Sequence, residues 1–146
     1  MEMRKLTIND YDEIYAFWRA TPGMGLNDID DSKEGIDKYL KRNPNTCFVA
    51  TISNKIVGII LSGHDGRRGY IYHTAVSLNY RNKGIGSALV NAAIAALHDE
   101  GISKVALVVF KNNEIGNMFW EYRGFNVRED LNYRNKALTG LKRIDT

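Results

Sequence analysis

Two cations and two glycines stand close together in residues 80–89, where they could bind an anion. The segment reads Tyr-Arg-Asn-Lys-Gly-Ile-Gly-Ser-Ala-Leu. Arg81 and Lys83 supply positive charge, while Gly84 and Gly86 lack the Cβ atoms that would keep a ligand away from the backbone. The chemistry that these residue types allow is the binding of phosphate oxygens by main-chain N–H groups.

The flanking sequence places this segment between a strand and a helix. Residues 69–76 before it are aromatic and β-branched, which is typical of a strand. After it, apolar residues recur at helical spacing as far as Gly101: they are Ile85, Ala88, Leu89, Ala92, Ala96 and Leu97. The first turn of such a helix has N–H groups without partners, and they carry the positive end of the helix dipole. The sequence therefore predicts a phosphate-binding turn at the start of this helix.

Other phosphate-binding loops fit the segment less well. A P-loop needs Gly-Lys followed by Ser or Thr, whereas Gly86 is followed by Ser87 and Ala88. A dinucleotide-binding fingerprint needs a third glycine where Leu89 stands. An ordinary strand–helix turn with solvated cations is the remaining alternative. The pattern Arg-x-x-Gly-x-Gly resembles the acetyl-CoA pyrophosphate loop of the GNAT superfamily of N-acetyltransferases.

A second segment, residues 113–125, is similar to another motif of that family. It reads Asn-Glu-Ile-Gly-Asn-Met-Phe-Trp-Glu-Tyr-Arg-Gly-Phe, and the family's motif reads Asn-x-x-Ala-x-x-Leu-Tyr-Glu-x-x-Gly-Phe. The resemblance implies that Asn113 holds the pantetheine arm, because its amide both donates and accepts hydrogen bonds. A helix cap is an equal alternative for Asn113, and the two roles could coexist.

This second segment also departs from the family pattern. Trp120 stands where the family often has a tyrosine that acts as general acid, and an indole has no hydroxyl for that role. Tyr122 lies about 200° around the helix from Trp120 and cannot simply replace the tyrosine. Val108 and Val109 occupy the part of the preceding strand where the family often has a glutamate base. Neither side-chain role carries over.

The resemblance implies transfer of acetyl from acetyl-CoA to a primary amine by direct attack, without a metal. In the family a main-chain N–H of the strand before the loop, here that of Val76, polarises the thioester carbonyl. The residues that the resemblance assigns to the coenzyme are Thr74, Ala75, Val76, Arg81, Asn82, Lys83, Gly84, Ile85, Gly86, Ser87, Asn113 and Trp120. The acceptor is a small molecule or a peptide or protein that bears an amine.

The acceptor amine must lose a proton before it attacks. A lysine-like ammonium costs roughly 4.6 kcal/mol to deprotonate at pH 7, so desolvation, a base or a water chain must help. Tyr72 and His73 are the candidate bases, and strand alternation predicts that they point to opposite faces, so at most one faces the acceptor. Core packing or surface exposure is the alternative for each. Cys47 lies in an apolar run and is expected to pack in the core rather than act as a nucleophile.

The first two helices and their connection usually help to form the acceptor site in the family. Here this part of the chain combines apolar groups with carboxylates, namely Trp18, Met24, Leu26, Asp28, Asp30 and Asp31. Such carboxylates could bind a cationic amine. Alternatively, Asp31 caps a helix, the other two are solvated and Trp18 belongs to the core.

The length and composition indicate one domain, residues 1–146, with an ordinary globular balance of 44% hydrophobic and 25% charged residues. The net charge of +3 and the mixed signs do not favour a nucleic-acid partner. No run reaches the roughly 18 apolar residues of a membrane span, and no signal peptide is recognisable, so a cytoplasmic location is expected. Family relatives are often dimers, and a homodimer is possible.

Hydrophobic periodicity gives an element order of β-α-α-β-β-β-α-β-α-β-β. This order predicts an α/β (α+β) protein with a mixed, mostly antiparallel central sheet flanked by helices, as in the GNAT fold. Residues 104–110 are expected to be a strand buried on both faces, and residues 125–146 to hold two terminal strands. In the helix over residues 114–123, one face is expected to be formed by Ile115, Met118, Phe119 and Tyr122.

Two other classes of function remain beside the enzyme. A catalytically weak or inactive CoA-binding regulatory module would retain the loop and explain Trp120 and the missing glutamate. A nucleic-acid-binding protein would need clustered cations with aromatic residues, which the sequence does not show.

Overall fold

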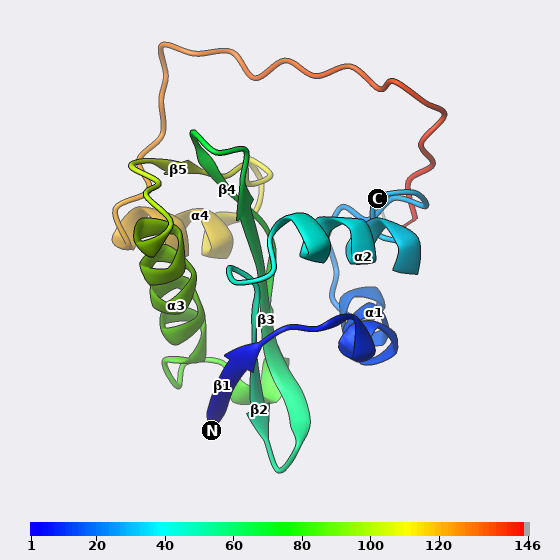
Figure 1. Cartoon of the computed structure of the whole chain (residues 1–146). Helices are drawn as coiled ribbons and strands as arrows, with labels where there is room; N and C mark the ends of the chain where they lie inside the picture. Colours follow the sequence, from blue (N-terminus) through cyan, green and yellow to red (C-terminus); the bar gives the residue numbers. More distant parts are fainter. Residues whose placement is uncertain (145–146) are drawn as a thin grey trace.

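A sheet in the order β1-β2-β3-β4-β5 forms the centre of the computed structural model, which describes residues 1–144 (Figure 1). The strands are β1 (Glu2–Lys5), β2 (Phe48–Ile52), β3 (Lys55–His64), β4 (Gly69–Val76) and β5 (Val105–Ala106). Neighbours from β1 to β4 are antiparallel, and β5 runs parallel to β4. The predicted mixed, mostly antiparallel sheet is confirmed.

Helices cover both faces of this sheet (Figure 1). The helices are α1 (Tyr11–Arg19), α2 (Lys33–Arg42), α3 (Ile85–Asp99) and α4 (Glu114–Tyr122), with short 3-10 turns η1 (Ile8–Asp10) and η2 (Leu78–Tyr80). Helices α1 and α2 pack on one face and share a core with Leu6, Val49 and Ile59. Helices α3 and α4 pack on the other face with Ala50, Val57 and Ile60. Helices α1, α2 and α3 bury the apolar stripe that their periodicity predicts, as Ile14 and Trp18 do in α1.

The pairing of β3 with β4 contains one irregularity, and it bears on the site. Between Ile60 and Ser62 of β3, the single residue Leu61 lies opposite two residues of β4, Tyr72 and His73. A bulge of this kind inserts one extra residue into a strand and breaks the alternation of side chains between the two faces.

Because of this bulge, two neighbouring side chains of β4 both lie on the α1–α2 face. The Tyr72 ring is 5.8 Å from the ring of Tyr39 in α2, and the His73 ring is 4.9 Å from that of Trp18 in α1. The expectation that Tyr72 and His73 point to opposite faces is therefore wrong.

The two terminal strands expected in the last part of the chain do not form within residues 125–144. After α4 the chain runs as an exposed extended segment that arches from α4 to the side of α2 (Figure 1). The strand β5 is only two residues long, so it offers little edge for another strand to pair with. The remaining two residues of the prediction, 145 and 146, lie outside the described chain.

The absence of an outer strand also changes residues 104–110 and α4. Residues 104–110 are not buried on both faces: only Val105–Ala106 pair with β4, while Val108 is 61% exposed. In α4, Phe119 and Trp120 face the sheet, whereas the other residues expected inward are exposed; they are Ile115, Met118 and Tyr122. Both predictions assumed a covering layer that the described chain does not provide.

Candidate functional site

The end of β4 carries an N–H group that points away from the sheet. The amide of Ser77 donates to the carbonyl of Val57 at 2.8 Å. In an antiparallel ladder this places the N–H of Val76 on the side away from β3. Within the described chain no strand pairs with Val76 on that side, because β5 pairs only with Gly69 and Tyr70 at the other end of β4. The predicted carbonyl-polarising amide therefore has a free direction toward a ligand.

The loop between η2 and α3 presents a run of unengaged amides. Gly84 has φ +80° and precedes the first residue of α3, and its carbonyl accepts from the N–H of Ala88 at 3.0 Å. Within the described chain, the N–H groups of residues 82–87 have no hydrogen-bond acceptor. A Cβ at Gly84 would meet no atom within 4 Å, so the loop is open to solvent here. These are the features of an anion cradle at a helix N-terminus.

The two glycines of the loop serve different purposes. A Cβ at Gly86 would lie 3.0 Å from Cε1 of Phe119, which is tighter than ordinary van der Waals contact. Gly86 is therefore required by the close approach of α4 to α3. Gly84 alone combines a left-handed backbone with open space, so it is the glycine that suits a bound phosphate.

Both predicted cations lie at this cradle. The Nε of Arg81 donates to the carbonyl of Val76 at 3.1 Å, which fixes the guanidinium beside the end of β4. Lys83 is exposed, and its Nζ lies 5.7 Å from the centre of the Tyr80 ring. The cations therefore border the loop amides, as a diphosphate ligand would require.

A third cation, Arg123, approaches the same helix end from α4. Its guanidinium lies 3.6 Å from the centre of the Phe119 ring and donates to the Phe119 carbonyl at 2.9 Å and to the hydroxyl of Ser87. Sequence reasoning missed this residue. The signal for it was only a cation inside the second motif, 36 residues from its partner.

Asn113 begins α4 and acts as its cap. Its Oδ1 accepts from the N–H of Gly116 at 2.9 Å, and a Cβ at Gly116 would be 2.4 Å from the Asn113 Nδ2. The capping role is therefore confirmed. A pantetheine contact through Nδ2 stays a prediction, and the capping bond, which uses Oδ1, leaves that group available for it.

Trp120 lies in the core rather than on a surface. It is 9% exposed, and its ring meets those of Phe119 and Phe125 edge-on at 5.0 and 5.1 Å. Its contact with the coenzyme stays a prediction that this burial does not favour. Tyr122 is 89% exposed.

On the α1–α2 face, a histidine and an aspartate form a pair that the sequence did not reveal. The Nε2 of His73 lies 2.7 Å from Oδ1 of Asp31, and the Asp31 carboxyl is buried. The N–H of Asn27 donates to Asp31 Oδ2 at 2.9 Å, and the hydroxyl of Tyr11 donates to the Asp31 carbonyl at 2.7 Å. The cap of α2 is Ser32, so Asp31 is free to orient the imidazole.

Phenols line β4 beside this pair. The rings of Tyr70 and Tyr72 are 4.7 Å apart, and Tyr72 is half exposed. Burial, followed by the neighbouring Tyr133 phenol, raises the pKa of both groups. Asp30 also raises the pKa of Tyr72. At neutral pH these phenols are therefore protonated, so Tyr72 is unsuited to accept a proton.

Cys47 has the environment of a structural residue. It is 1% exposed, and its Sγ lies 3.2 Å from the carbonyl of Ser62. Burial raises the pKa of the thiol to about 12, although the bond with Ser62 acts in the opposite direction. A thiol that remains protonated is a poor nucleophile.

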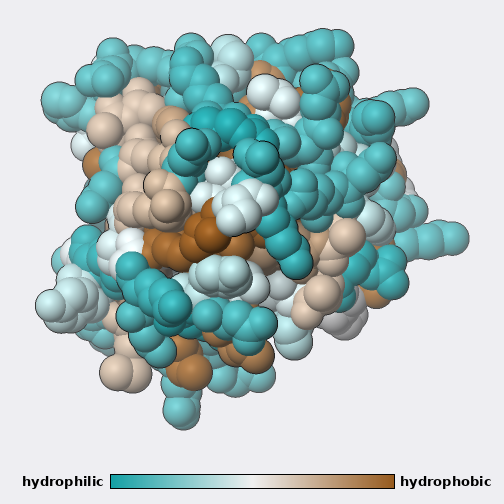
Figure 2. All heavy atoms as spheres, turned by 90° about the horizontal axis from the view of Figure 1, so that it is seen from below, coloured by the Kyte–Doolittle hydropathy of each residue, from teal (hydrophilic) through white to brown (hydrophobic). Residues whose placement is uncertain are grey.

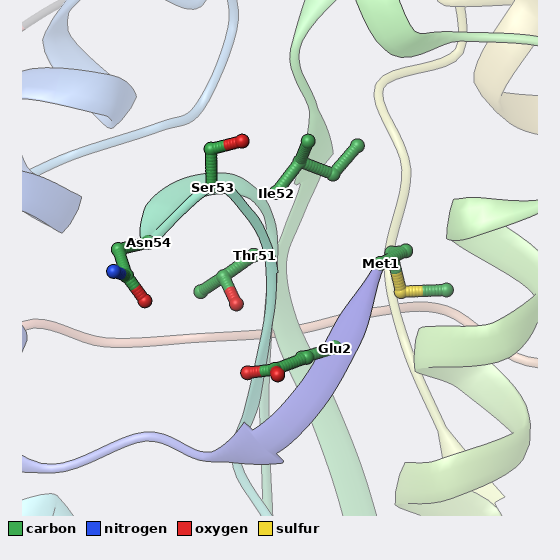
Figure 3. A pocket seen from close by; sticks show the side chains of 6 residues that line it. All are labelled: Met1, Glu2, Thr51, Ile52, Ser53 and Asn54. Atoms are coloured by element: carbon green, nitrogen blue, oxygen red, sulfur yellow. The ribbon is translucent and has the colours of Figure 1, made fainter.

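A hollow of about 310 Å³ lies elsewhere, at the turn between β2 and β3 (Figure 3). It is lined by Met1, Glu2, Thr51, Ile52, Ser53 and Asn54, none of which is a candidate site residue. The face of the molecule at this end is largely hydrophilic with an apolar patch near its centre (Figure 2). Glu2 is the one ionisable side chain of the hollow, so it carries no evident chemistry.

Two negative findings apply to the described residues 1–144. No cluster of three or more His, Cys, Asp or Glu side chains could hold a metal ion there. None of the helices in this range has the length and apolar character needed to span a membrane.

Comparisons with known proteins agree with this geometry. A profile described as the acetyltransferase (GNAT) family matches residues 11–125. An acetyltransferase of Sodalis glossinidius is 28% identical over 138 residues, covering 94% of this chain and 96% of the relative. An acetyltransferase of Photorhabdus laumondii is 31% identical over 118 residues, covering 78% of each chain.

Solved structures share the fold. Ard1 from Thermoplasma volcanium aligns with a TM-score of 0.77 at 21% identity, over 87% of this chain and 83% of its own. The PaiA N-acetyltransferase of Thermoplasma acidophilum, solved in complex with coenzyme A, aligns with a TM-score of 0.71 at 20% identity, over 87% and 90%. An aminoglycoside acetyltransferase from a soil metagenomic sample aligns with a TM-score of 0.70 at 23% identity, over 94% and 96%.

Proposed function

The chain belongs to the acetyltransferase (GNAT) family, and from this premise we propose that it transfers acetyl from acetyl-CoA to a primary amine by direct attack. The observation that carries the proposal is the run of unengaged amides at residues 82–87, next to the outward N–H of Val76. A structural relative is known in complex with coenzyme A, which supports the same ligand here.

The residues present suit a CoA diphosphate. Gly84 leaves the cradle open, and the amides of the first turn of α3 would donate to the phosphate oxygens. Arg81 and Lys83 would add charge at the rim. When bound, acetyl-CoA supplies a thioester whose acetyl carbon is electrophilic and whose thiolate is the leaving group.

At the thioester, the main-chain N–H of Val76 would donate a hydrogen bond to the acetyl oxygen as negative charge develops on that oxygen. This role needs only the direction of the main chain at the end of β4. It therefore does not depend on the tyrosine that Trp120 replaces. The leaving thiolate also needs little help, since a thiol pKa near 8.5 makes it a moderate base at most.

On the acceptor side, we propose that His73 is the base that accepts the proton of the attacking amine. The imidazole would take the ammonium proton at Nδ1, while Asp31 holds Nε2 and stabilises the imidazolium. His73 lies three positions before Val76 in the strand, which is about 10 Å, so the proton would cross a short chain of water molecules. The amine nitrogen then forms the bond to the acetyl carbon as the carbon–sulfur bond breaks, and the nitrogen loses a second proton that the departing thiolate takes up.

A CoA-binding module without catalysis is the second candidate, and the burial of Trp120 at the general-acid position is the observation that favours it. One experiment separates the two. The protein is incubated with acetyl-CoA and four classes of amine, namely a peptide N-terminus, a lysine side chain, a polyamine and an antibiotic amine, and products are identified by mass spectrometry.

Acetylation of at least one class, with release of free coenzyme A thiol, is the result that the proposal expects. Saturable binding of coenzyme A by calorimetry without acetylation of any acceptor would favour the module. If calorimetry detected no binding, both candidates would be excluded.

A further inference from the structure

The end of the described chain returns to the loop that carries Asp31. Residues 126–141 arch away from α4 (Figure 1), and the chain then meets the segment between α1 and α2. The N–H of Ile144 donates to the carbonyl of Leu26, and the N–H of Asp28 donates to the carbonyl of Lys142, both at 3.0 Å. We call residues 142–144 the C-terminal anchor.

A side chain strengthens this contact. The carboxylate of Asp28 accepts from the N–H of Lys142 at 2.8 Å, across 114 residues of sequence. Ile144 also packs against the core cluster under α1 and α2. The anchor thus joins residues 26–28 through three main-chain donors and one apolar side chain.

Beside the anchor, this loop is held by the side chain of Leu26, which is fully buried in the core, and by Asn27, whose Oδ1 accepts from the N–H groups of Ile29 and Asp30. The main chain before Leu26 is less restrained. Gly23 and Gly25 both have φ +75° and are exposed, and a Cβ at Gly23 would meet no atom within 4 Å. Glycines in such a setting leave the backbone flexible. The second half of the loop is held separately, because a Cβ at Gly35 of α2 would be 2.4 Å from the carbonyls of Ile29 and Asp30.

Asn27, between the two anchored positions, is linked to the proposed base through Asp31. The N–H of Asn27 donates to Oδ2 of Asp31 at 2.9 Å, while Oδ1 of Asp31 meets Nε2 of His73 at 2.7 Å. Any movement of residues 26–28 therefore removes one of the bonds that orient the Asp31 carboxylate. The sequence gives no sign of this connection.

We propose that the C-terminal anchor is a positioning element of the reaction, which orients His73 by holding Asn27 against Asp31. The inference rests on the proposed function, because it assigns His73 the role of proton acceptor. Neither Lys142 nor Asp28 touches the reacting groups. They act through the loop, so loss of the hydrogen bond between them should lower kcat and leave binding of the coenzyme unchanged.

The first test uses three variants that probe the hydrogen bond from the N–H of Lys142 to the carboxylate of Asp28. Asp28→Ala removes the acceptor of the Lys142 N–H, Asp28→Asn keeps an oxygen that can accept it, and Lys142→Ala keeps the donor while removing the side chain. We expect kcat to fall about tenfold in Asp28→Ala only, since small misplacements of catalytic groups have effects of this size or larger. The Kd for coenzyme A, measured by calorimetry, should stay within about twofold.

The second test removes the anchor and does not depend on turnover. A chain ending at Leu141 is compared with the full chain of 146 residues and with a chain ending at Ile144, and amide hydrogen exchange is followed in residues 26–31. We expect faster exchange at Asn27 in the shortest chain, because its N–H loses the fixed position of its acceptor. Should the shortest chain fail to fold, Asp28→Ala and Asp28→Asn are compared by the same exchange measurement.

Three results are decisive. Equal kcat for Asp28→Ala and wild type, with unchanged exchange at Asn27, would overturn the inference while leaving the proposed function in place. A loss of kcat in Asp28→Asn as large as in Asp28→Ala would also overturn it, because the hydrogen bond would not be the cause. If wild type acetylates no acceptor, the proposed function fails, and unchanged exchange at Asn27 would then overturn the anchor itself.

Discussion

The two sides of the candidate site use different parts of the chain: one uses main-chain groups and the other uses side chains. The proposed coenzyme side consists of main-chain amides at residues 82–87 and Val76, with exposed cations at its rim. The acceptor side consists of side chains, above all Asp31 and His73, which come from segments 42 residues apart. Backbone amides bind any ligand of suitable charge and shape, whereas side chains set which acceptor fits and which group takes its proton.

This difference predicts how each side responds to mutation. A change to the coenzyme side should alter binding of coenzyme A before it alters chemistry. A change to the acceptor side should alter turnover and leave coenzyme binding intact. The substitutions below test that separation, from the largest expected effect to the smallest.

Gly84→Asp should have the largest effect. It places a carboxylate in the open cradle, where it would repel the phosphates, and like-charge contacts of this kind cost several kcal/mol. We expect at least about a 100-fold loss of affinity for coenzyme A in calorimetry. Gly66→Asp is the matched control, because Gly66 also has a positive φ and no atom within 4 Å of its Cβ position. Retained affinity in Gly84→Asp would contradict the cradle.

His73→Gln tests the acceptor side. Removal of a general base lowers kcat by about 100-fold or more, and we expect a loss of this size with an unchanged Kd for coenzyme A. His98→Gln, in the exposed part of α3, is the control and should behave as wild type. Turnover that survives in His73→Gln would show that the proton leaves by another route.

Trp120→Phe separates packing from catalysis. The indole lies in the core between Phe119 and Phe125, so we expect the free energy of unfolding to fall by about 1–2 kcal/mol in urea titrations. Both kcat and the Kd for coenzyme A should change by less than about twofold. A collapse of turnover in a stably folded variant would mean that the indole takes part in the reaction.

Replacement of Cys47 by alanine should change neither turnover nor binding of coenzyme A. With a thiol pKa of about 12, only about one thiol in ten thousand is ionised at pH 8, so iodoacetamide should label the folded protein very slowly. Labelling should become fast in urea, where burial no longer raises the pKa. Rapid labelling of the folded chain, or loss of turnover in Cys47→Ala, would reopen an acyl-enzyme route.

Much of the coenzyme side could be predicted from the sequence because it depends on local order. A strand, two glycines and a helical repeat follow one another within residues 69–101, and each is recognisable by itself. What the sequence could not show was the separate reason for Gly86, which is the approach of Phe119. Arg123 was missed for the same reason, since its contact with Ser87 depends on how two helices pack.

The acceptor side was largely unpredictable because it depends on long-range geometry. The bulge in β4 arises because two of its residues lie opposite a single residue of β3, and the sequence of residues 69–76 alone does not predict it. It brings Tyr72 and His73 to one face, against the rule of alternation. The pairing of Asp31 with His73 and the return of Lys142 to Asp28 link residues that are distant in sequence.

The order of the elements was predictable up to α4, although the strand expected over residues 104–110 forms only at Val105–Ala106. Periodicity predicted α1, α2 and α3 and the strands β2, β3 and β4, because each has a face that must be buried. The alternation in β1 is weak, and none of its residues is fully buried. The expected outer strands had no such support, since residues 126–143 are exposed throughout. The exposed positions of Ile115 and Met118 in α4 follow from the same lack of a covering layer.

The central claim is that main-chain amides at the start of α3 bind the diphosphate of the coenzyme. The most direct test is a titration of coenzyme A into ¹⁵N-labelled protein, followed by amide chemical shifts. We predict saturable changes that are largest at residues 82–87, including both loop glycines, with a further change at Val76. Binding whose largest changes fall elsewhere, or no saturable change at all, would contradict the account.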